Sequence, residues 1–268
     1  MRLPSTAKTQ AASHYNFEVG AQMKVYIQAS KEYMPHNYNF FNAYQGFKEM
    51  GHEIVMFHTN DELRQSAIED VVVGYVGTVR RRLADFGIIT PEMDYPDELK
   101  SFLGRQIWEI KMSQVINYPE RWPVFVKSVE DKKFTGVVVR STKDLVGCGT
   151  YGEDPDALCS EVVNFKAEWR CFVRYGKILD VRPYKGDWRL QYDPNIIEAA
   201  VNGFITAPNG YAMDFGVTDD GRTLMIEVND GYALGCYGLL YIDYAKLLSA
   251  RWAELTNTED ACAFDLDL

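Results

Sequence analysis

The chain has 268 residues, of which 47% are hydrophobic and 25% are charged, and its formal net charge at pH 7 is −10. This composition is typical of a soluble globular protein and excludes a largely disordered chain, and no run of about 18 apolar residues is present to span a membrane. The acidic excess disfavours a nucleic-acid surface, which needs clustered Lys and Arg, but it allows a local basic pocket.

The first 22 residues carry no apolar stretch long enough for a signal peptide, and we expect them to form a flexible tail. The five cysteines include no CxxC motif, which favours free thiols in a reducing, cytoplasmic setting. All four histidines lie within the first 60 residues. Proton transfer further along the chain must therefore use carboxylates, Lys, Tyr or the substrate itself.

Residues 23–96 alternate between strand-like and helix-like segments. The predicted strands are 23–28, 53–57 and 70–73, and the predicted helices are one around 40–47 that ends at Gly51 and one at 77–86. This alternation predicts a small parallel sheet. No GxGxxG follows the first strand, which disfavours a dehydrogenase with a dinucleotide site.

The pattern changes after a proline-rich and acidic linker at residues 90–97. A helix is expected at 98–108 and a final helix at 241–255. The expected strands between them are 124–127, 136–140, 161–163, 169–173, 178–183, 211–217 and 223–229, with a short helix or strand at 198–207. The second segment is therefore predicted to be α+β with mainly antiparallel strands.

The hairpin at 211–229 carries the strongest chemical signal. If opposed residue numbers sum to 439, Asp214 faces Met225 and lies diagonal to Glu227, and Glu227 and Asn229 share that face because side chains alternate. Two carboxylates and an amide on one face suit Mg²⁺. The alternative is a solvated polar face, but the glycine-rich residues 231–238 favour close approach of a ligand.

Two further signals are basic. Lys127 ends a buried strand, where it could meet phosphate oxygens or simply extend its ammonium into solvent. Glu168 and Arg170 share one strand face, and Arg182 follows in the next strand. Two arginines aimed into one cleft suit a phosphate or a carboxylate, and the alternative is a set of surface ion pairs.

Taken in order, these features resemble the ATP-grasp superfamily, in particular a bacterial and phage clade whose substrates are mostly undefined. The matching residues are Lys127, Glu161-Val162-Val163, Arg170, Asp214 and Glu227-x-Asn229, with DYPDELKSFLGRQIW (94–108) and EVNDGYALGCYG (227–238). The resemblance implies a small α/β domain at 23–96 before an ATP-grasp domain at 97–268. Within the latter, two lobes (97–158 and 164–268) would bind nucleotide between antiparallel sheets, around a hinge at 159–163.

The resemblance also implies residue roles. Lys127 would bind the α- and β-phosphates, the backbone of Glu161 and Val163 would hold the adenine edge, and Val162 would pack on its ring. Asp214, Glu227 and Asn229 would hold one or two Mg²⁺ ions, or Mn²⁺. Arg170 and Arg182 would face the transferred phosphoryl group, and we place Glu168 with the nucleotide-binding residues.

The sequence departs from the family pattern at two points. An earlier phosphate-binding lysine is missing, so Arg105 or Lys111 must take its place, and we favour Arg105. The glycine-rich phosphate loop is reduced to Lys133-Phe134-Thr135-Gly136.

The activity implied is ATP-dependent ligation of a carboxylate to an amine through an acyl phosphate, with release of ADP and phosphate. The alternatives are a kinase that uses Asp230 or Asp187 as general base, and a non-catalytic nucleotide-binding module. The substrates would be small molecules or peptides, received by residues 184–195 and 231–238, without a membrane or nucleic-acid partner. The oligomeric state stays open.

Overall fold

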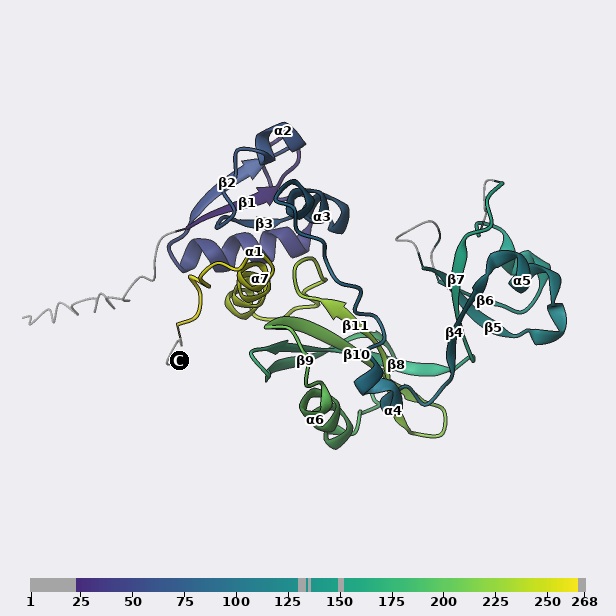
Figure 1. Ribbon diagram of the computed structural model, residues 1–268. Coiled ribbons are helices and arrows are strands. Elements are labelled where there is room, and N and C mark those ends of the chain that lie inside the picture. The colour runs from purple at the N-terminus through teal and green to yellow at the C-terminus, as the bar shows by residue number, and fades with distance from the viewer. Residues whose placement is uncertain (1–22, 130–133, 135, 149–151, 265–268) are drawn as a thin grey trace, which may run out of the picture.

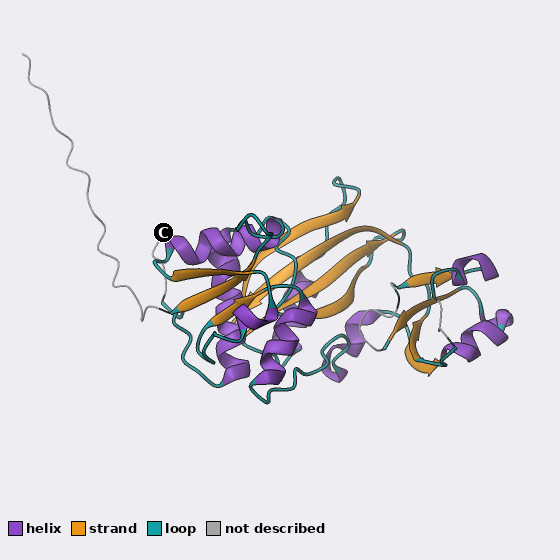
Figure 2. Ribbon diagram, turned by 90° about the horizontal axis from the view of Figure 1, so that it is seen from above, coloured by secondary structure: helices purple, strands orange, loops and turns teal. Residues whose placement is uncertain are grey.

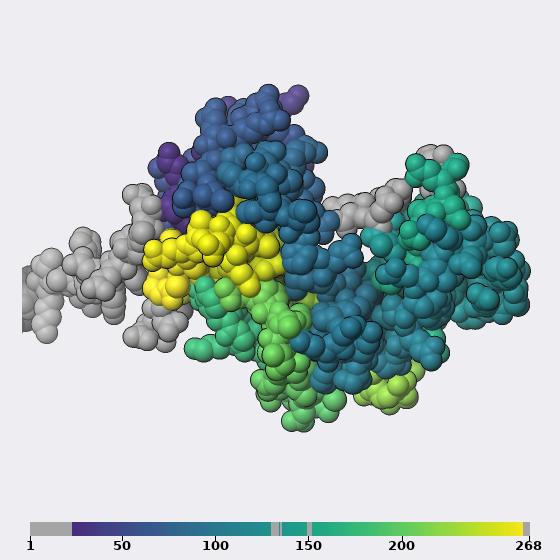
Figure 3. Space-filling model, viewed as in Figure 1, coloured from purple at the N-terminus to yellow at the C-terminus, as the bar shows by residue number. Residues whose placement is uncertain are grey.

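A computed structural model describes residues 23–129, 134, 136–148 and 152–264, arranged around three β-sheets. Two of the sheets and the long C-terminal helix form the main body, and the third sheet forms a smaller lobe to one side (Figures 1 and 3). The expected tail at 1–22 and, in the reduced phosphate loop, Lys133 and Thr135 lie outside the described residues. No helix in the described part of the chain is long and apolar enough to cross a membrane.

The first sheet is parallel, as the alternating pattern predicts, with strand order β2-β1-β3. Its strands are β1 (Lys24–Gln28), β2 (Glu53–Phe57) and β3 (Val71–Val73), and its helices are α1 (Tyr38–Glu49), α2 (Asn60–Leu63) and α3 (Val76–Asp85). Asn37 starts α1 by accepting a hydrogen bond from the Phe40 amide. Gly51, at a φ of 84°, allows the chain to leave that helix.

The second sheet is antiparallel, with strand order β11-β10-β8-β9. Its strands are β8 (Phe165–Arg174), β9 (Lys177–Gly186), β10 (Gly210–Thr218) and β11 (Thr223–Asp230). The segment at 198–207, expected to be a short helix or strand, begins within the helix α6 (Pro194–Gly203). One face of the sheet packs Met213, Phe215 and Met225 against Ile197 of α6. The other face carries the charged residues described below.

The third sheet, with strand order β4-β7-β5-β6, forms the small lobe. Its elements are β4 (Ile107–Lys111), α5 (Met112–Asn117), η2 (Pro119–Arg121), β5 (Val124–Ser128), β6 (Val137–Val139), η3 (Thr142–Leu145) and β7 (Asp156–Ser160). It has its own core, which includes Met112, Val126 and Ala157. Residues 161–164 after β7 lead into β8 and form no strand, contrary to the strand expected at 161–163.

The helix expected at 98–108 is wrong in its second half. The chain forms the 3₁₀ turn η1 (Asp97–Leu99) and the short helix α4 (Lys100–Leu103), and Gly104 then adopts a φ of 59°. A left-handed glycine of this kind ends a helix, so the chain turns and continues as β4. The apolar residues Ile107 and Trp108 therefore belong to a strand.

The last helix, α7 (Tyr241–Thr256), joins the first sheet to the second. Tyr244, Leu248 and Trp252 are buried on its predicted face, and they share one core with Phe47 of α1 and Val72 of β3. Trp252 also donates its indole N–H to the carbonyl of Ile68. In Figures 1 and 2, α7 lies beside α1, between the parallel sheet and the large antiparallel sheet.

Gly46 determines how closely α1 approaches α7, and its substitution is our first prediction. A Cβ atom at Gly46 would lie 2.1 Å from the Tyr241 carbonyl oxygen and 2.7 Å from the Ala245 Cβ. Because overpacking a helix contact costs about 1–3 kcal/mol, Gly46→Ala should lower the free energy of unfolding by that amount in urea denaturation.

Gly77 in α3 is the matched control, because a Cβ there meets nothing within 4 Å. Gly77→Ala should be neutral or should stabilise by about 0.4–1 kcal/mol. Equal effects of the two substitutions would contradict the role given to Gly46.

Candidate functional site

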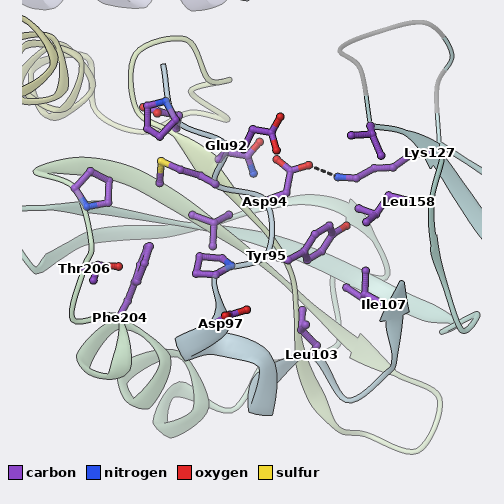
Figure 4. Close-up of a pocket in the computed structure, with 18 of the residues that line it drawn as sticks. Glu92, Asp94, Tyr95, Asp97, Leu103, Ile107, Lys127, Leu158, Phe204 and Thr206 are labelled. Atoms are coloured by element: carbon purple, nitrogen blue, oxygen red, sulfur yellow. Dashed lines mark hydrogen bonds and ion pairs between the residues drawn. The ribbon is translucent and has the colours of Figure 1, made fainter. Parts of the chain in front are cut away.

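A cavity of about 1190 Å³ lies between the small lobe and the large antiparallel sheet. Ile107, Lys127 and Leu158 line it from the small lobe, and Asn229 lines it from the end of β11. The linker at residues 91–97 passes through it, with Asp94 and Tyr95 beside Lys127 (Figure 4). The family resemblance implies that a nucleotide would bind at this position, between two antiparallel sheets.

Lys127, near the end of β5, reaches across this cavity. Its ammonium nitrogen lies 2.5 Å from Asp94 Oδ2 and 3.2 Å from Glu227 Oε2, and 4.7 Å from the centre of the Tyr95 ring. Burial alone would lower the pKa of Lys127, but Glu227, Tyr95 and Asp94 together raise it above its ordinary value. Lys127 is therefore a charged, partly desolvated cation paired with two carboxylates, not a side chain extended into solvent.

Arg170 and Asp214 form a buried ion pair on the adjacent strands β8 and β10. The guanidinium Nε and Nη2 each lie 2.7 Å from one carboxylate oxygen of Asp214, which is 3% exposed. Burial disfavours the charge on Arg170, yet Asp214 raises the arginine pKa above its usual value. Asn229 on β11 donates its amide N–H to the same carboxylate at 3.2 Å.

The predicted register of the hairpin is wrong by one residue near the turn and by two at Asp214, and the observed register brings the two acids closer. Near the turn the partners are Val217 and Thr223, but a β-bulge follows, and Asp214 lies directly opposite Glu227. Ile226 is the extra residue of the bulge, which moves Met225 into the core on the opposite face. Directly opposed residues on one face have Cβ atoms about 4.5–5.5 Å apart, closer than the expected diagonal pair.

Arg182 and Glu168 extend the charged face towards β9. Arg182 lies directly opposite Arg170, and it donates to the Gly238 carbonyl at 2.7 Å and contacts Asp180 at 3.3 Å. Glu168 accepts a hydrogen bond from Lys185 at 2.5 Å. The predicted arginine pair therefore exists, and both side chains already have anionic or carbonyl partners.

The glycine-rich segment 231–238 lies over this face. The Tyr237 ring stands 4.8 Å from the Arg170 guanidinium carbon and stacks on Tyr184 with the ring centres 4.8 Å apart. Burial, Asp214 and Glu168 all raise the pKa of Tyr184, so its hydroxyl stays protonated. The two segments proposed to receive the substrates thus meet through these tyrosines, a contact that the sequence did not reveal.

Arg105 and Lys111, the two candidates for the missing lysine, are placed differently. Arg105 lines the cavity and donates to the backbone carbonyls of Leu103, Met225 and Ile226 at 2.7–3.1 Å. Lys111 pairs with Asp156 at 2.8 Å, and both side chains are about half exposed. The geometry therefore favours Arg105 as the residue close to a bound ligand.

The three residues expected at the hinge connect the two lobes. Glu161 is exposed, Val162 and Val163 are half-buried, and Glu161 exchanges backbone and side-chain hydrogen bonds with Gln106. Asp94 and Tyr95 open the segment 94–108 that resembles the family, but they were not predicted as site residues because the prolines and acids around them indicated a linker. Their contacts with Lys127 span more than thirty positions, which a local pattern does not reveal.

The candidate metal ligands fit a hard cation by chemistry. Asp214, Glu227 and Asn229 supply oxygen atoms from one face of two paired strands. Within the described residues, no group of three or more His, Cys, Asp or Glu side chains is placed to hold a metal ion. In the free protein, Arg170 and Lys127 neutralise the two carboxylates instead.

Comparison with known proteins gives two kinds of match. A family model for the ATP-grasp domain, R2K clade family 2, matches residues 102–247, which is more than half of the chain. No curated protein matches the chain.

Several solved structures share the fold. N5-carboxyaminoimidazole synthetase from Staphylococcus aureus aligns with a TM-score of 0.58 at 12% identity, over 88% of this chain and 78% of that one. D-alanine–D-alanine ligase from Bacillus anthracis, complexed with ATP, aligns with a TM-score of 0.55 at 15% identity, over 88% and 97%. L-amino acid ligase from Bacillus licheniformis gives 0.52 at 11% identity, over 87% and 75%.

The buried pair of Arg170 and Asp214 leads to our second prediction. Asp214→Ala leaves a buried guanidinium without its carboxylate, so the free energy of unfolding should fall by about 3–5 kcal/mol in urea denaturation. The double variant Arg170→Met with Asp214→Leu removes both charges and should lose less stability than Asp214→Ala alone.

The exposed pair of Lys24 and Glu53, 3.7 Å apart with both side chains about half exposed, serves as control. Glu53→Ala should cost less than about 1 kcal/mol. If Asp214→Ala lowered the free energy of unfolding as little as Glu53→Ala does, the stabilising role given to the buried pair would be contradicted.

Proposed function

The chain belongs to the ATP-grasp domains of R2K clade family 2, and on that basis we propose that it is an ATP-dependent ligase. It would join a carboxylate to an amine and release ADP and phosphate. The observation that carries this proposal is the arrangement of charges: Lys127 of the small lobe contacts Glu227 of the large sheet, and Arg170, Asp214 and Asn229 lie on the same sheet face as Glu227. The fold shared with three ligases and synthetases supports the assignment.

The nucleotide would lie between the two antiparallel sheets. Lys127 and Arg105 would contact its phosphates, and the backbone of Glu161 and Val163 would hold the adenine edge with Val162 against the ring. Glu168, on the face of Arg170, would contribute a polar contact. We accordingly propose the division into a domain at 23–96 and two nucleotide-binding lobes, 97–158 and 164–268, around the connection at 159–163.

Asp214, Glu227 and Asn229 would hold one or two Mg²⁺ ions when nucleotide is bound. Bound Mg²⁺ would neutralise the charge that develops on the phosphate oxygens. Before binding, Arg170 and Lys127 keep the two carboxylates paired, which preserves their positions until the cation arrives.

The chemistry starts with a poor electrophile. A carboxylate oxygen attacks the γ-phosphorus of ATP and ADP leaves, which gives an acyl phosphate. The amine then attacks the acyl carbon, a proton is lost from nitrogen, and inorganic phosphate leaves as the amide forms. Arg170 and Arg182 would hold the phosphoryl oxygens during both steps, so the protein mainly positions groups and stabilises charge.

The substrates would enter beside the stacked rings of Tyr184 and Tyr237, where residues 184–195 meet residues 231–238. This surface combines aromatic rings with the charged side chains of Arg182 and Lys185, which suits a small molecule or peptide that carries a carboxylate.

A kinase would need a general base, and both carboxylates considered for that role are already paired. Asp230 accepts two hydrogen bonds from Arg251, at 2.6 and 2.7 Å. Hydrogen bonds from Arg189 lower the pKa of Asp187 to about 2, which makes that carboxylate a weak base. These contacts favour the ligase over the kinase.

Our third prediction concerns nucleotide affinity. Lys127→Ala removes one charge-assisted contact to phosphate and should weaken ATP binding by about 1.5–3 kcal/mol in titration calorimetry. Adenosine binding should be unchanged, because adenosine carries no phosphate. Lys143→Ala on an exposed part of the same lobe is the control and should bind ATP like the unaltered protein. An equal loss of adenosine binding would mean that Lys127 supports the lobe instead.

The fourth prediction tests the reaction class. Amino acids and short peptides are screened with ATP and Mg²⁺ for stimulated ADP release, and each positive acid is incubated with hydroxylamine in place of the amine. An acyl phosphate should give a hydroxamate together with ADP. Glu227→Gln should lose both products while its circular dichroism spectrum stays unchanged, since Glu227 is partly exposed and the substitution keeps its shape. A stable phosphate ester in place of hydroxamate would establish the kinase.

A further inference from the structure

The linker between the first sheet and the small lobe places a carboxylate where the proposed function requires a phosphate. Asp94 Oδ2 lies 2.5 Å from the ammonium nitrogen of Lys127, closer than Glu227 at 3.2 Å. In Figure 4 the Asp94 side chain points directly at Lys127, with the Tyr95 ring beside the same ammonium.

Asp94 is held from the large lobe, and Lys127 belongs to the small one. The carbonyl of Asp94 accepts the Val228 amide at 3.0 Å, which fixes the linker along the outer edge of β11. Lys127 lies in β5 of the separate small sheet. The contact between Asp94 and Lys127 therefore bridges the two lobes across the cavity.

The Asp94 carboxylate and a phosphate make the same kind of contact with an ammonium group. Each offers anionic oxygen acceptors, and the ammonium has three donors, of which Asp94 and Glu227 already engage two while a tyrosine ring covers another side. Asp94 is 56% exposed, whereas Lys127 is 17% exposed, so the carboxylate can leave into water more easily than the lysine can.

We propose that Asp94 competes with the phosphates of the nucleotide for Lys127, so that a ligand must displace this carboxylate in order to bind. The proposal rests on the function proposed above, in which Lys127 binds phosphate. Asp94 would then favour phosphate-bearing ligands over neutral ones, because only a ligand with its own anionic oxygens replaces the contact that Lys127 loses when Asp94 leaves.

Asp94→Asn removes the competing charge and keeps the shape of the side chain. ATP should bind about two- to fivefold more tightly, the range expected for a partly exposed ion pair, while adenosine affinity stays the same. The measurement is titration calorimetry with ATP and with adenosine, each without metal in EDTA and again with excess Mg²⁺.

Asp97→Asn is the matched control. Asp97 lies in the same linker and lines the same cavity, but its carboxylate pairs with Lys100 at 2.7 Å. It reports the effect of removing one negative charge near the site. A second control repeats Asp94→Asn in the Lys127→Ala background, where the substitution should no longer change ATP affinity.

The competition is supported if Asp94→Asn increases the affinity for ATP but not for adenosine, if Asp97→Asn does not, and if the increase requires Lys127. An equal gain from Asp97→Asn, or a gain that persists without Lys127, overturns it in favour of a general charge effect. If Asp94→Asn weakens ATP binding only when Mg²⁺ is present, Asp94 is a metal ligand, and the competition is also overturned. If Lys127→Ala by itself leaves ATP affinity unchanged, the phosphate site of the proposed function fails, a result distinct from those at Asp94.

Discussion

The buried pair of Arg170 and Asp214 is the constraint around which the rest of the site is organised. Two charges removed from water remain stable only when their geometry is good and further hydrogen bonds satisfy the remaining lone pairs. The antiparallel register of β8 and β10 sets the two residues opposite each other, Asn229 binds the carboxylate, and Tyr237 covers the guanidinium. The same face of the sheet is apolar two residues further along, at Phe172 and Ala212, so the site begins where the hydrophobic core ends.

The cations of the site already have oxygen partners in this structure. Lys127, which lines the cavity, has Asp94 and Glu227, and on the adjoining sheet face Arg170 has Asp214 and Arg182 has the Gly238 carbonyl. The phosphates and divalent cations of a bound ligand would replace some of these ion-pair partners, so no side chain would have to become charged in a buried place. The replacement costs little free energy because these side chains lose their hydration once, during folding, and stay oriented afterwards.

Local patterns in the sequence predicted the parallel strands and the end of α1 at Gly51 in the first unit, and the strands of the large antiparallel sheet, but they missed β4 and β7 of the small lobe and placed a strand at 161–163 where none forms. They placed Asp214, Glu227 and Asn229 on one face of the sheet because side chains alternate with a period of two, which a residue count can follow. They failed on the hairpin register, which is off by one residue at the turn and by one more beyond the bulge at Ile226, because nothing local signals that bulge. They also failed at residues 98–108, where Gly104 was not recognised as the end of a helix, and at Asp94, whose partner Lys127 is set by tertiary contacts alone.

The core shared by the first and last parts of the chain has a consequence for biosynthesis. Residues of β1, β3 and α1 are buried against α7 and the segment that precedes it, which are synthesised after both antiparallel sheets. Until then the apolar residues that these later elements cover, including Phe47 of α1 and Val72 of β3, lack that part of their packing, and exposed apolar surface is prone to aggregate. The nascent chain therefore has to keep residues 23–86 soluble while the two antiparallel sheets are still being made.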